Sequence, residues 1–437
     1  MAGRGRALSL AALSLAALSL AGCGAAGHAQ RPAPPIRTQA PIAARPRMPA
    51  ARPGQLALDA ALRRGLRLAG PGSEAAVYDL TAHQPLFALR DGVKGPPASV
   101  EKLYTSVALL RKLGPDARLR TSVLGTGHLG PDGIWHGDLY LRGGGDPTFG
   151  DGAFNRVFEL GYGPTALELV RQLTRAGIRR VTGMVIGDPS LFDSRRGSSA
   201  GGYVADIPDF GGELGGLTYD HGATGKLSPG AFAARQLALT MRGAHLQAMA
   251  ATATGVTPAG ARPLAAVESP PLSVMLRLMD VPSDDFFAEM LTKQLGARFA
   301  GHGTIDAGAR VIASVIKGFD LHPLILDGSG LVRADRSSPR EVIDLLRDLW
   351  HTPDGALLSA SLPVLGVSGT VRRIALGTAA QGNCMAKTGT LDNVTNLAGY
   401  CHRRSHHALA FALFAAGPSN TRALALEGQM IAAIARF

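Results

Sequence analysis

The sequence predicts an α+β protein in which an antiparallel sheet is flanked by helices and a mixed α/β domain is inserted. Short alternating apolar segments, typical of strands, stand at both ends of the body, at 75–79, 86–89, 384–391, 397–402 and 408–415. Segments with helical spacing dominate from 268 to 350. In the region between residue 120 and these helices, the sequence instead shows short strand-like segments separated by glycine-rich turns. We therefore expect one domain over 55–120 and 265–437, and an inserted domain over 121–264.

The first 54 residues are typical of an export leader and a tether. Two arginines precede an apolar run from Ala7 to Ala21, which is too short to span a bilayer but suits a secretory signal. The run ends in Leu-Ala-Gly-Cys23, which resembles the lipobox of bacterial lipoproteins; a plain signal peptide with an incidental cysteine is the alternative. We expect a signal peptide over 1–23, lipidation of Cys23 and a Pro/Ala/Arg-rich linker over 24–54.

The net charge of +12 is concentrated in this leader. Residues 1–58 hold seven of the 45 basic residues and no acidic one, so the other 38 basic residues face 33 acidic ones. A basic tail on a nearly balanced body favours adhesion to an anionic membrane or wall surface. It does not favour a nucleic-acid partner.

The body begins with an expected helix over 56–65 and the first two strands. A second helix is expected to start at Ser99, after a proline pair, and to end at Gly114-Pro115. Within the insert we expect strands and helices in turn, at 119–124, 137–141, 164–176 (helix), 181–186 and 225–242 (helix).

Helical spacing returns after the insert, and four helices are expected there. The second begins after a Pro282-Ser283 cap, and the others cover 272–279, 303–318 and 338–350. A hairpin then turns at Asp392-Asn393, and a helix over 421–437 closes the chain. Apart from Cys23, the sequence has only Cys384 and Cys401. An even pair in an exported protein favours a disulfide over two buried thiols, and pairing them centres the hairpin on its expected turn.

Three short motifs carry the chemistry. They are Ser99-x-x-Lys102, Ser283-Asp284-Asp285 and Lys387-Thr388-Gly389-Thr390. A serine is a weak nucleophile until a neighbouring base takes its proton, and a lysine one helical turn away can do that. A serine three residues before a lysine is also common at helix starts, so the first motif alone is weak. The ordered set of three is known from penicillin-binding proteins and class A β-lactamases.

The surrounding residues resemble the peptidase S13 family of D-alanyl-D-alanine carboxypeptidases/endopeptidases, the class C low-molecular-mass penicillin-binding proteins. The resemblance runs from about residue 56 to the end. It is carried by Pro-Ala-Ser-Val-x-Lys-Leu-x-Thr, Gly-Gly-Gly-Asp-Pro-Thr, Ser-Pro-Pro-Leu, Ser-Asp-x-Phe-x-Ala-Glu, Asp-Gly-Ser-Gly-Leu and Lys-Thr-Gly-Thr-Leu. It implies a penicillin-binding protein/β-lactamase-like transpeptidase domain with the long insert that distinguishes the family.

The resemblance implies an exported serine D,D-peptidase acting on peptidoglycan stem peptides, with β-lactam antibiotics as covalent inhibitors and no metal or organic cofactor. Ser99 would attack the carbonyl and Lys102 would take its proton, while Ser283 relays a proton to the leaving amine. Lys387 would place a positive charge beside the nucleophile and the substrate carboxylate.

The remaining residues of the third motif would bind the substrate. Thr388 and Thr390 would offer hydroxyls to its carboxylate, and Gly389 would let its backbone lie against the strand. The N–H groups of Ser99 and Thr390 would form the oxyanion hole.

Two residues depart from the family pattern. Asp285 stands where the family has asparagine, and an ionised carboxylate there favours the ammonium form of Lys102, which cannot act as a base. Val332 replaces a serine after Gly-Leu. We therefore expect reduced or altered activity with the nucleophile retained.

Two other functions compete with an active peptidase. A catalytically degenerate peptidoglycan-binding scaffold lipoprotein would keep the fold and lose turnover. A β-lactamase is the weaker alternative, because Asp285 is not at the position that such enzymes use to activate water. Tyr219-Asp220-His221 resembles a catalytic fragment, but it lies in the insert and we expect it to be structural.

Overall fold

The computed structural model describes residues 54–205, 210–222, 226–248, 252–402, 407–417 and 419–437. The expected signal peptide, Cys23 and all of the linker but Gly54 lie outside these residues. Within them, no helix combines the length and the apolar character needed to cross a membrane.

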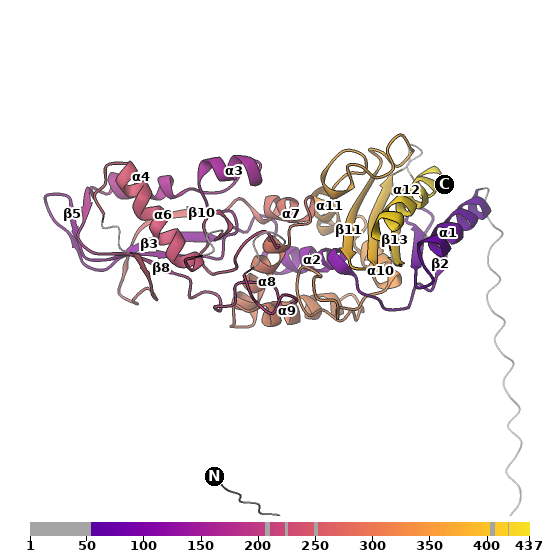
Figure 1. Ribbon diagram of the computed structural model, residues 1–437, viewed down its shortest axis with the longest axis horizontal. Coiled ribbons are helices and arrows are strands. Elements are labelled where there is room, and N and C mark those ends of the chain that lie inside the picture. Colours follow the sequence, from indigo (N-terminus) through magenta and orange to yellow (C-terminus); the bar gives the residue numbers. More distant parts are fainter. Residues whose placement is uncertain (1–53, 206–209, 223–225, 249–251, 403–406, 418) are drawn as a thin grey trace, which may run out of the picture. The chain divides into compact units, whose positions relative to one another are not determined.

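A five-stranded sheet joins the two ends of the body (Figure 1). Its order is β11-β12-β13-β1-β2, and every neighbouring pair is antiparallel. The strands are β1 (Glu74–Asp79), β2 (Gln84–Leu89), β11 (Cys384–Leu391), β12 (Val394–His402) and β13 (Ala408–Ala416). The N-terminal pair thus completes a sheet whose other strands lie about 300 residues later.

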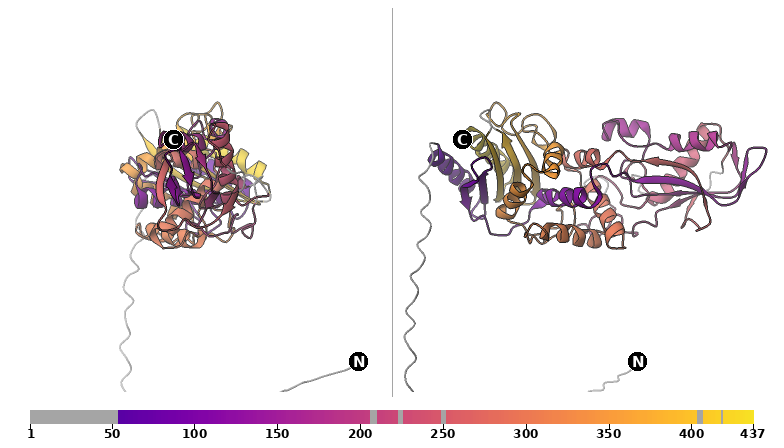
Figure 2. Two further views of the ribbon diagram at one scale, coloured as in Figure 1. Left: turned by 90° about the vertical axis from the view of Figure 1, so that its left-hand side faces the viewer. Right: turned by 180° about the vertical axis from the view of Figure 1, so that it is seen from behind.

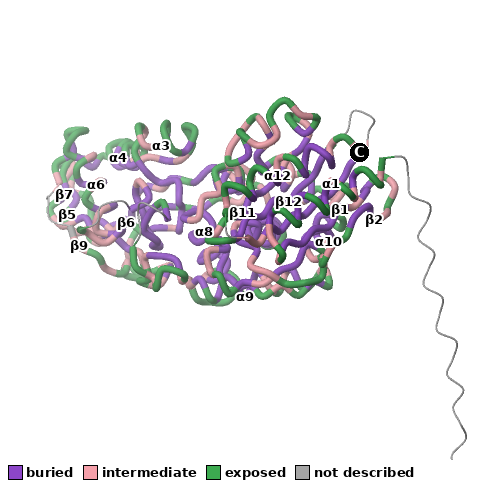
Figure 3. The backbone as a smooth tube through the Cα atoms, turned by 45° about the vertical axis from the view of Figure 1, so that its right-hand side comes forward, coloured by how far each residue is buried: buried purple, intermediate pink, exposed green. Residues whose placement is uncertain are grey.

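Alternating residues of this sheet serve two hydrophobic cores. In β12, Leu397 belongs to the core with α1 (Gln55–Ala69) and α12 (Asn420–Arg436), whereas Ala398 and Tyr400 face the core with α10 (Pro339–Leu349). Figures 1 and 2 show α1 and α12 together beside the sheet. Both faces are therefore covered, and β12 is buried along almost its whole length (Figure 3).

A group of helices packs beyond β11. Its members are α2 (Lys102–Leu113), α7 (Leu272–Asp280), α8 (Asp285–Phe299), α9 (Ile305–Lys317) and α11 (Pro353–Ser361). Two helix starts differ from the expectation. Ser99 lies in a 3₁₀ turn, η1 (Ala98–Glu101), and α2 begins only at Lys102. The cap of α8 is Asp284, whose carboxylate accepts from the Phe287 N–H, and not Ser283.

The residues between the two parts of this domain build a second sheet, of order β10-β3-β6-β8-β9, and a small one, β4-β5-β7. Their strands are β3 (Arg120–Gly125), β4 (His128–Leu129), β5 (Ile134–His136), β6 (Leu139–Arg142), β7 (Arg180–Val181), β8 (Val185–Asp188), β9 (Thr252–Thr254) and β10 (Arg262–Glu268). Helices α3 (Gly152–Phe158), α4 (Ala166–Arg175) and α6 (Pro229–Gly243) and the 3₁₀ turn η2 (Asp220–Gly222) accompany them.

This region has a core of its own, whose buried members run from Val123 to Val267. Its strands are mixed, since β6, β8 and β9 are parallel while β3 and β10 pair antiparallel. We propose that 121–264 is an inserted domain, entered and left through the neighbouring strands β3 and β10.

The terminal hairpin has the register that the cysteines require. Cys384 lies directly opposite Cys401 in the β11–β12 pair, and their sulfur atoms are bonded at 2.06 Å. Leu391 pairs with Val394, which leaves Asp392 and Asn393 as the turn.

Candidate active site

The turn that carries Ser99 is held from below by the sheet. Asn396 of β12 is buried, and its amide donates to the carbonyl oxygens of Pro96 at 3.0 Å and Pro97 at 2.9 Å. Gly389 of β11 lies opposite Asn396, and a Cβ there would meet the Pro97 carbonyl oxygen at 2.6 Å. Only glycine lets the strand approach the turn this closely. The half-exposed Ser99 is thereby fixed at the edge of β11.

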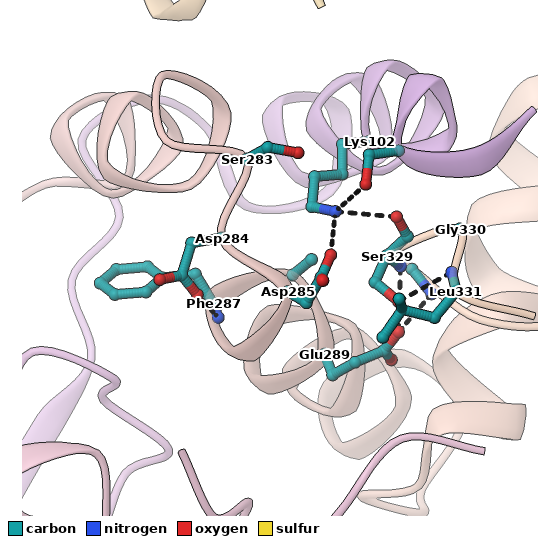
Figure 4. Close-up of polar contacts among 12 residues, drawn as sticks. Lys102, Ser283, Asp284, Asp285, Phe287, Glu289, Ser329, Gly330 and Leu331 are labelled. Carbon is teal, nitrogen blue, oxygen red and sulfur yellow. Dashed lines mark hydrogen bonds and ion pairs between the residues drawn. The ribbon is translucent and has the colours of Figure 1, made fainter. Parts of the chain in front are cut away.

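Lys102 is the first residue of α2, directly after this turn, and it is fully buried. Its Nζ lies 2.9 Å from the Ser99 hydroxyl, 2.5 Å from a carboxylate oxygen of Asp285 and 2.8 Å from the Ser329 carbonyl oxygen. Figure 4 shows the lysine between Asp285 and Ser329. Ser99 of the first motif, Asp285 of the second motif and the Ser329 carbonyl thus meet at one nitrogen, Nζ of Lys102.

The three partners of Lys102 constrain its chemistry. The ionised Asp285 and the Ser329 carbonyl can only accept hydrogen bonds, so each needs an N–H from the lysine. A neutral amine supplies two N–H groups and keeps one lone pair, which would face the Ser99 hydroxyl. The geometry therefore suits a base. The adjacent negative charge of Asp285 works against it, because it stabilises the ammonium form.

A second lysine, Lys387, contacts the serine of the second motif, Ser283. Lys387 of β11 is fully buried, and its Nζ donates to the Ser283 hydroxyl at 2.6 Å and to the Thr388 carbonyl oxygen at 3.0 Å. Burial and the nearby positive charge of Lys102 lower the pKa of Lys387 to about 7. The backbone of Ser283 has a left-handed conformation, with φ of 65°. A lysine that exchanges its proton near neutral pH suits a relay through Ser283.

Asp280 lies buried beneath the second motif at the end of α7. Its carboxylate accepts from the hydroxyls of Ser106 at 2.9 Å and Ser361 at 2.7 Å. Burial raises its pKa to about 6, although the positive charge of Lys387 opposes the shift. Asp280 is therefore ionised near neutral pH and helps to keep a proton on Lys387.

The loop that presents the Ser329 carbonyl is folded around two carboxylates. Asp327 accepts from the Gly330 N–H at 2.6 Å and from the Val332 N–H at 2.9 Å. Glu289 of α8 accepts from the Ser329 N–H at 2.9 Å. The contact of Val332 is made by its backbone, so the valine that replaces the family's serine preserves this turn.

Four fully buried carboxyl groups lie in this part of the helical layer. Burial raises the pKa of Glu289 to about 8 and that of Asp335 to about 9, and it also raises the pKa values of Glu101 and Asp327. Mutual repulsion adds to these shifts. The protonated, neutral forms of Glu289 and Asp335 are therefore favoured at neutral pH, whereas the carboxylate that contacts Lys102 directly is Asp285.

The other predicted site residues of the third motif, Thr388 and Thr390, lie on β11 together with Lys387. The Thr388 hydroxyl is bonded at 2.8 Å to that of Thr370, in a 3₁₀ turn, η3 (Gly369–Val371), beside β11. Thr390 is exposed. Cys384 and Cys401 lie at the far end of the hairpin from Thr390, so the disulfide joins β11 to β12 away from the three motifs.

Sequence reasoning missed three residues that shape the site: Asn396, Asp280 and Thr370. Asn396 could have been noticed, because it is the one amide side chain in a mostly apolar strand sequence, Val-Thr-Asn-Leu-Ala-Gly-Tyr. Asp280 closes an apolar helix just before the Ser283 motif. Thr370 stands in an irregular segment and gives no such signal.

The Tyr219-Asp220-His221 segment has a structural role. The His221 ring is buried, with Nε2 2.8 Å from a Glu159 carboxylate oxygen and Nδ1 3.0 Å from the Gly211 carbonyl oxygen. It also stacks on Phe286 of α8, with ring centroids 4.3 Å apart. The segment therefore supports the start of α8, and among the described residues no serine or cysteine is hydrogen-bonded to the His221 ring.

Comparison with known proteins agrees with the motifs. The D-Ala-D-Ala carboxypeptidase 3 (S13) family matches residues 55–209 and 227–437. Carboxypeptidase DacB of Mycolicibacterium smegmatis is 30% identical over 427 residues, which cover 91% of this chain and 89% of that protein. The D-alanyl-D-alanine carboxypeptidase of an Actinomadura species is 28% identical over 457 residues, which cover 85% and 82%.

The fold has solved counterparts. The crystal structure of penicillin binding protein 4 (dacB) from Haemophilus influenzae superposes with a TM-score of 0.71 at 20% identity, covering 85% of this chain and 98% of that one. This likeness confirms the predicted penicillin-binding-protein fold, and the family match confirms the resemblance seen in the sequence. The chain belongs to the D-Ala-D-Ala carboxypeptidase 3 (S13) family of serine peptidases.

Proposed function

We propose that the chain is a serine D,D-peptidase that cleaves the terminal D-Ala-D-Ala bond of peptidoglycan stem peptides through an acyl-Ser99 intermediate. The observation that carries the proposal is the placement of the Ser99 hydroxyl 2.9 Å from the buried Lys102 amine, with Ser283 and Lys387 paired beside them. Family membership supports the same reaction.

In the first step, Ser99 Oγ attacks the carbonyl carbon of the penultimate D-Ala, and its proton passes to Lys102 Nζ. The N–H groups of Ser99 and Thr390 stabilise the oxyanion. When the C–N bond breaks, Ser283 gives its hydroxyl proton to the leaving amine and recovers one from Lys387. Water then attacks the Ser99 ester and gives a proton to the neutral Lys387 through Ser283. Ser99 Oγ takes back the proton held by Lys102, which releases the shortened peptide and restores both lysines.

The substrate's free carboxylate binds at the third motif. Lys387 supplies positive charge, and Thr388 and Thr390 supply hydroxyl donors. A β-lactam carries a carboxylate beside a strained amide. Lys387, Thr388 and Thr390 would therefore bind its carboxylate and place the amide carbonyl beside Ser99, which it acylates. D,D-crosslinks, whose acyl side is the same, are the second expected substrate.

Asp285 attenuates this chemistry without removing it. Its 2.5 Å ion pair with Lys102 favours the protonated lysine, while the hydrogen-bond geometry still permits the neutral one. We propose slower acylation than an asparagine at this position would give.

We further propose that the protein is exported and held at the cell envelope by a lipid on Cys23. A substrate in the cell wall requires export, and the leader, the basic tail and the Cys384–Cys401 disulfide support it. Labelling with palmitate that is lost in Cys23→Ser would support the anchor; equal labelling of both proteins would overturn it.

Release of D-alanine from a muropeptide pentapeptide tests the activity. The purified chain should release D-alanine, and the Ser99→Ala variant should not. A folded wild-type protein that binds peptidoglycan without releasing D-alanine would instead be the scaffold. Hydrolysis of penicillin that outpaces D-alanine release would point to the β-lactamase.

A further inference from the structure

A cavity of about 940 Å³ lies away from the catalytic motifs, between α1, α12 and the segment after η3. Its size is within the range of small-molecule sites. Apolar side chains form much of its wall, and three of them, Leu68, Leu376 and Leu424, are 42%, 55% and 36% exposed. Such an uncovered apolar surface has the character of a site for a hydrocarbon group.

The charged residues of this cavity all have one sign. Three arginines line it: Arg64 of α1, Arg373 of the segment after η3 and Arg436 of α12. Among the described residues, no acidic side chain lines it. Within the described part of the chain, none of these three arginines forms an ion pair, whereas Arg63 on the same helix pairs with Asp59 at 2.8 Å. Guanidinium groups present several N–H donors in a plane that matches phosphate oxygens.

An apolar wall with an arginine rim fits a ligand that has a hydrocarbon chain and an anionic head. We propose that this cavity binds an anionic phospholipid of the membrane surface, with an acyl chain against the leucines and the phosphate at the arginines. The basic segment that precedes α1 in the sequence favours an anionic phospholipid as the ligand. Helix α1 forms one wall, and it follows a segment, residues 1–54, that carries seven arginines and no acidic residue.

The proposal does not depend on peptidase activity. Thr370 both lines the cavity and is bonded to Thr388 of the third motif, so variants at Thr370 would disturb both sites. The test therefore uses residues on other parts of the wall, and penicillin labelling serves as a check that the catalytic motifs are intact.

The probe is a short-chain phosphatidylglycerol, titrated calorimetrically into the full chain below the critical micelle concentration. Short-chain phosphatidylcholine and glycerol phosphate are titrated in parallel, because they lack the net charge and the acyl chains, respectively. Phosphatidylglycerol should bind at least about tenfold more tightly than either. Equal affinity for phosphatidylcholine, or for glycerol phosphate, would overturn the proposal.

Two sets of variants locate the binding. Arg64→Gln/Arg373→Gln/Arg436→Gln should weaken phosphatidylglycerol binding about tenfold or more. The matched control, Arg67→Gln/Arg372→Gln/Arg422→Gln, removes the same charge from the same three segments at exposed positions outside the cavity and should bind like wild type. Equal weakening by both triples would mean general charge attraction and would overturn the site.

Gly428→Leu tests the apolar part. Gly428 of α12 lines the cavity, and a Cβ there would meet nothing nearer than the Ala375 nitrogen at 3.6 Å. A leucine should therefore fill the cavity without a backbone clash, and it suits a helix better than glycine does. Binding should be lost while the melting temperature is kept. Undiminished binding by a folded Gly428→Leu protein would contradict the proposal.

Discussion

Replacing Asp285 by asparagine removes one charge beside the Lys102 base and keeps an oxygen that can accept its N–H. The two charged groups meet at 2.5 Å, with Lys102 fully buried and the Asp285 side chain 18% exposed. At an effective dielectric constant of about 20, unit charges about 4 Å apart attract by about 4 kcal/mol. Recovering a third of that energy in the acylation step would accelerate it about tenfold. We therefore expect Asp285→Asn to be acylated by penicillin at least about tenfold faster at neutral pH.

The assay is the second-order rate of acylation by a fluorescent penicillin. Asp284→Asn is the matched control, because it removes the neighbouring charge, keeps a side chain that can cap α8 and does not contact Lys102. It should acylate at close to the wild-type rate. An unchanged or slower rate for Asp285→Asn, or an equal gain in both variants, would refute the electrostatic reasoning.

Three further predictions concern other parts of the site. Asn396→Ala removes both hydrogen bonds beneath the Ser99 turn, and it should lower the free energy of unfolding by about 1–3 kcal/mol and slow acylation; stability unchanged in urea would contradict this support role. Cys384→Ser/Cys401→Ser opens a loop of 17 residues and should lower the free energy of unfolding by about 3 kcal/mol without abolishing acylation; the reduced wild type is its control. The pKa of Lys387 is about 7, so this group is positive below that pH and neutral above it. Acylation by penicillin should fall as the pH rises through about 7 relative to acylation by penicillin methyl ester, which has no carboxylate; parallel profiles would exclude Lys387 as the carboxylate partner.

The sequence was sufficient to predict the fold class because its patterns are strong and local. The alternating segments after Cys384 predicted the hairpin, and the cysteine pair predicted its register, which the structure reproduces at Asp392-Asn393. Helices α3 and α11 were missed, since they are only seven and nine residues long and each contains glycine. Short segments of this kind form helices through caps and tertiary packing more than through periodicity.

The start of α8 shows where sequence reasoning ends. Ser283, Asp284 and Asp285 can each cap a helix, so spacing alone could not choose among them. In the structure Asp284 takes the cap, which leaves Ser283 free to meet Lys387 and Asp285 free to meet Lys102. Motif order predicted the site residues, but which residue of the Ser283 motif meets which lysine depends on packing between segments more than 100 residues apart.

The contacts of the supporting residues are longer in range still. Asn396 bonds to carbonyl groups about 300 residues away, and no local pattern predicts such a contact. The tight approach of Gly389 to Pro97 has the same origin. These details come from the closure of the sheet by strands from both ends of the chain.

The most direct test of the proposed mechanism is to locate the penicillin adduct by mass spectrometry. The chain is incubated with benzylpenicillin, denatured, digested and compared with a folded Ser99→Ala protein of matched melting temperature. We expect the penicilloyl mass on the peptide that contains Ser99, and none on the variant. An adduct on another residue, or no adduct on the folded wild type after prolonged incubation, would contradict an acyl-Ser99 intermediate.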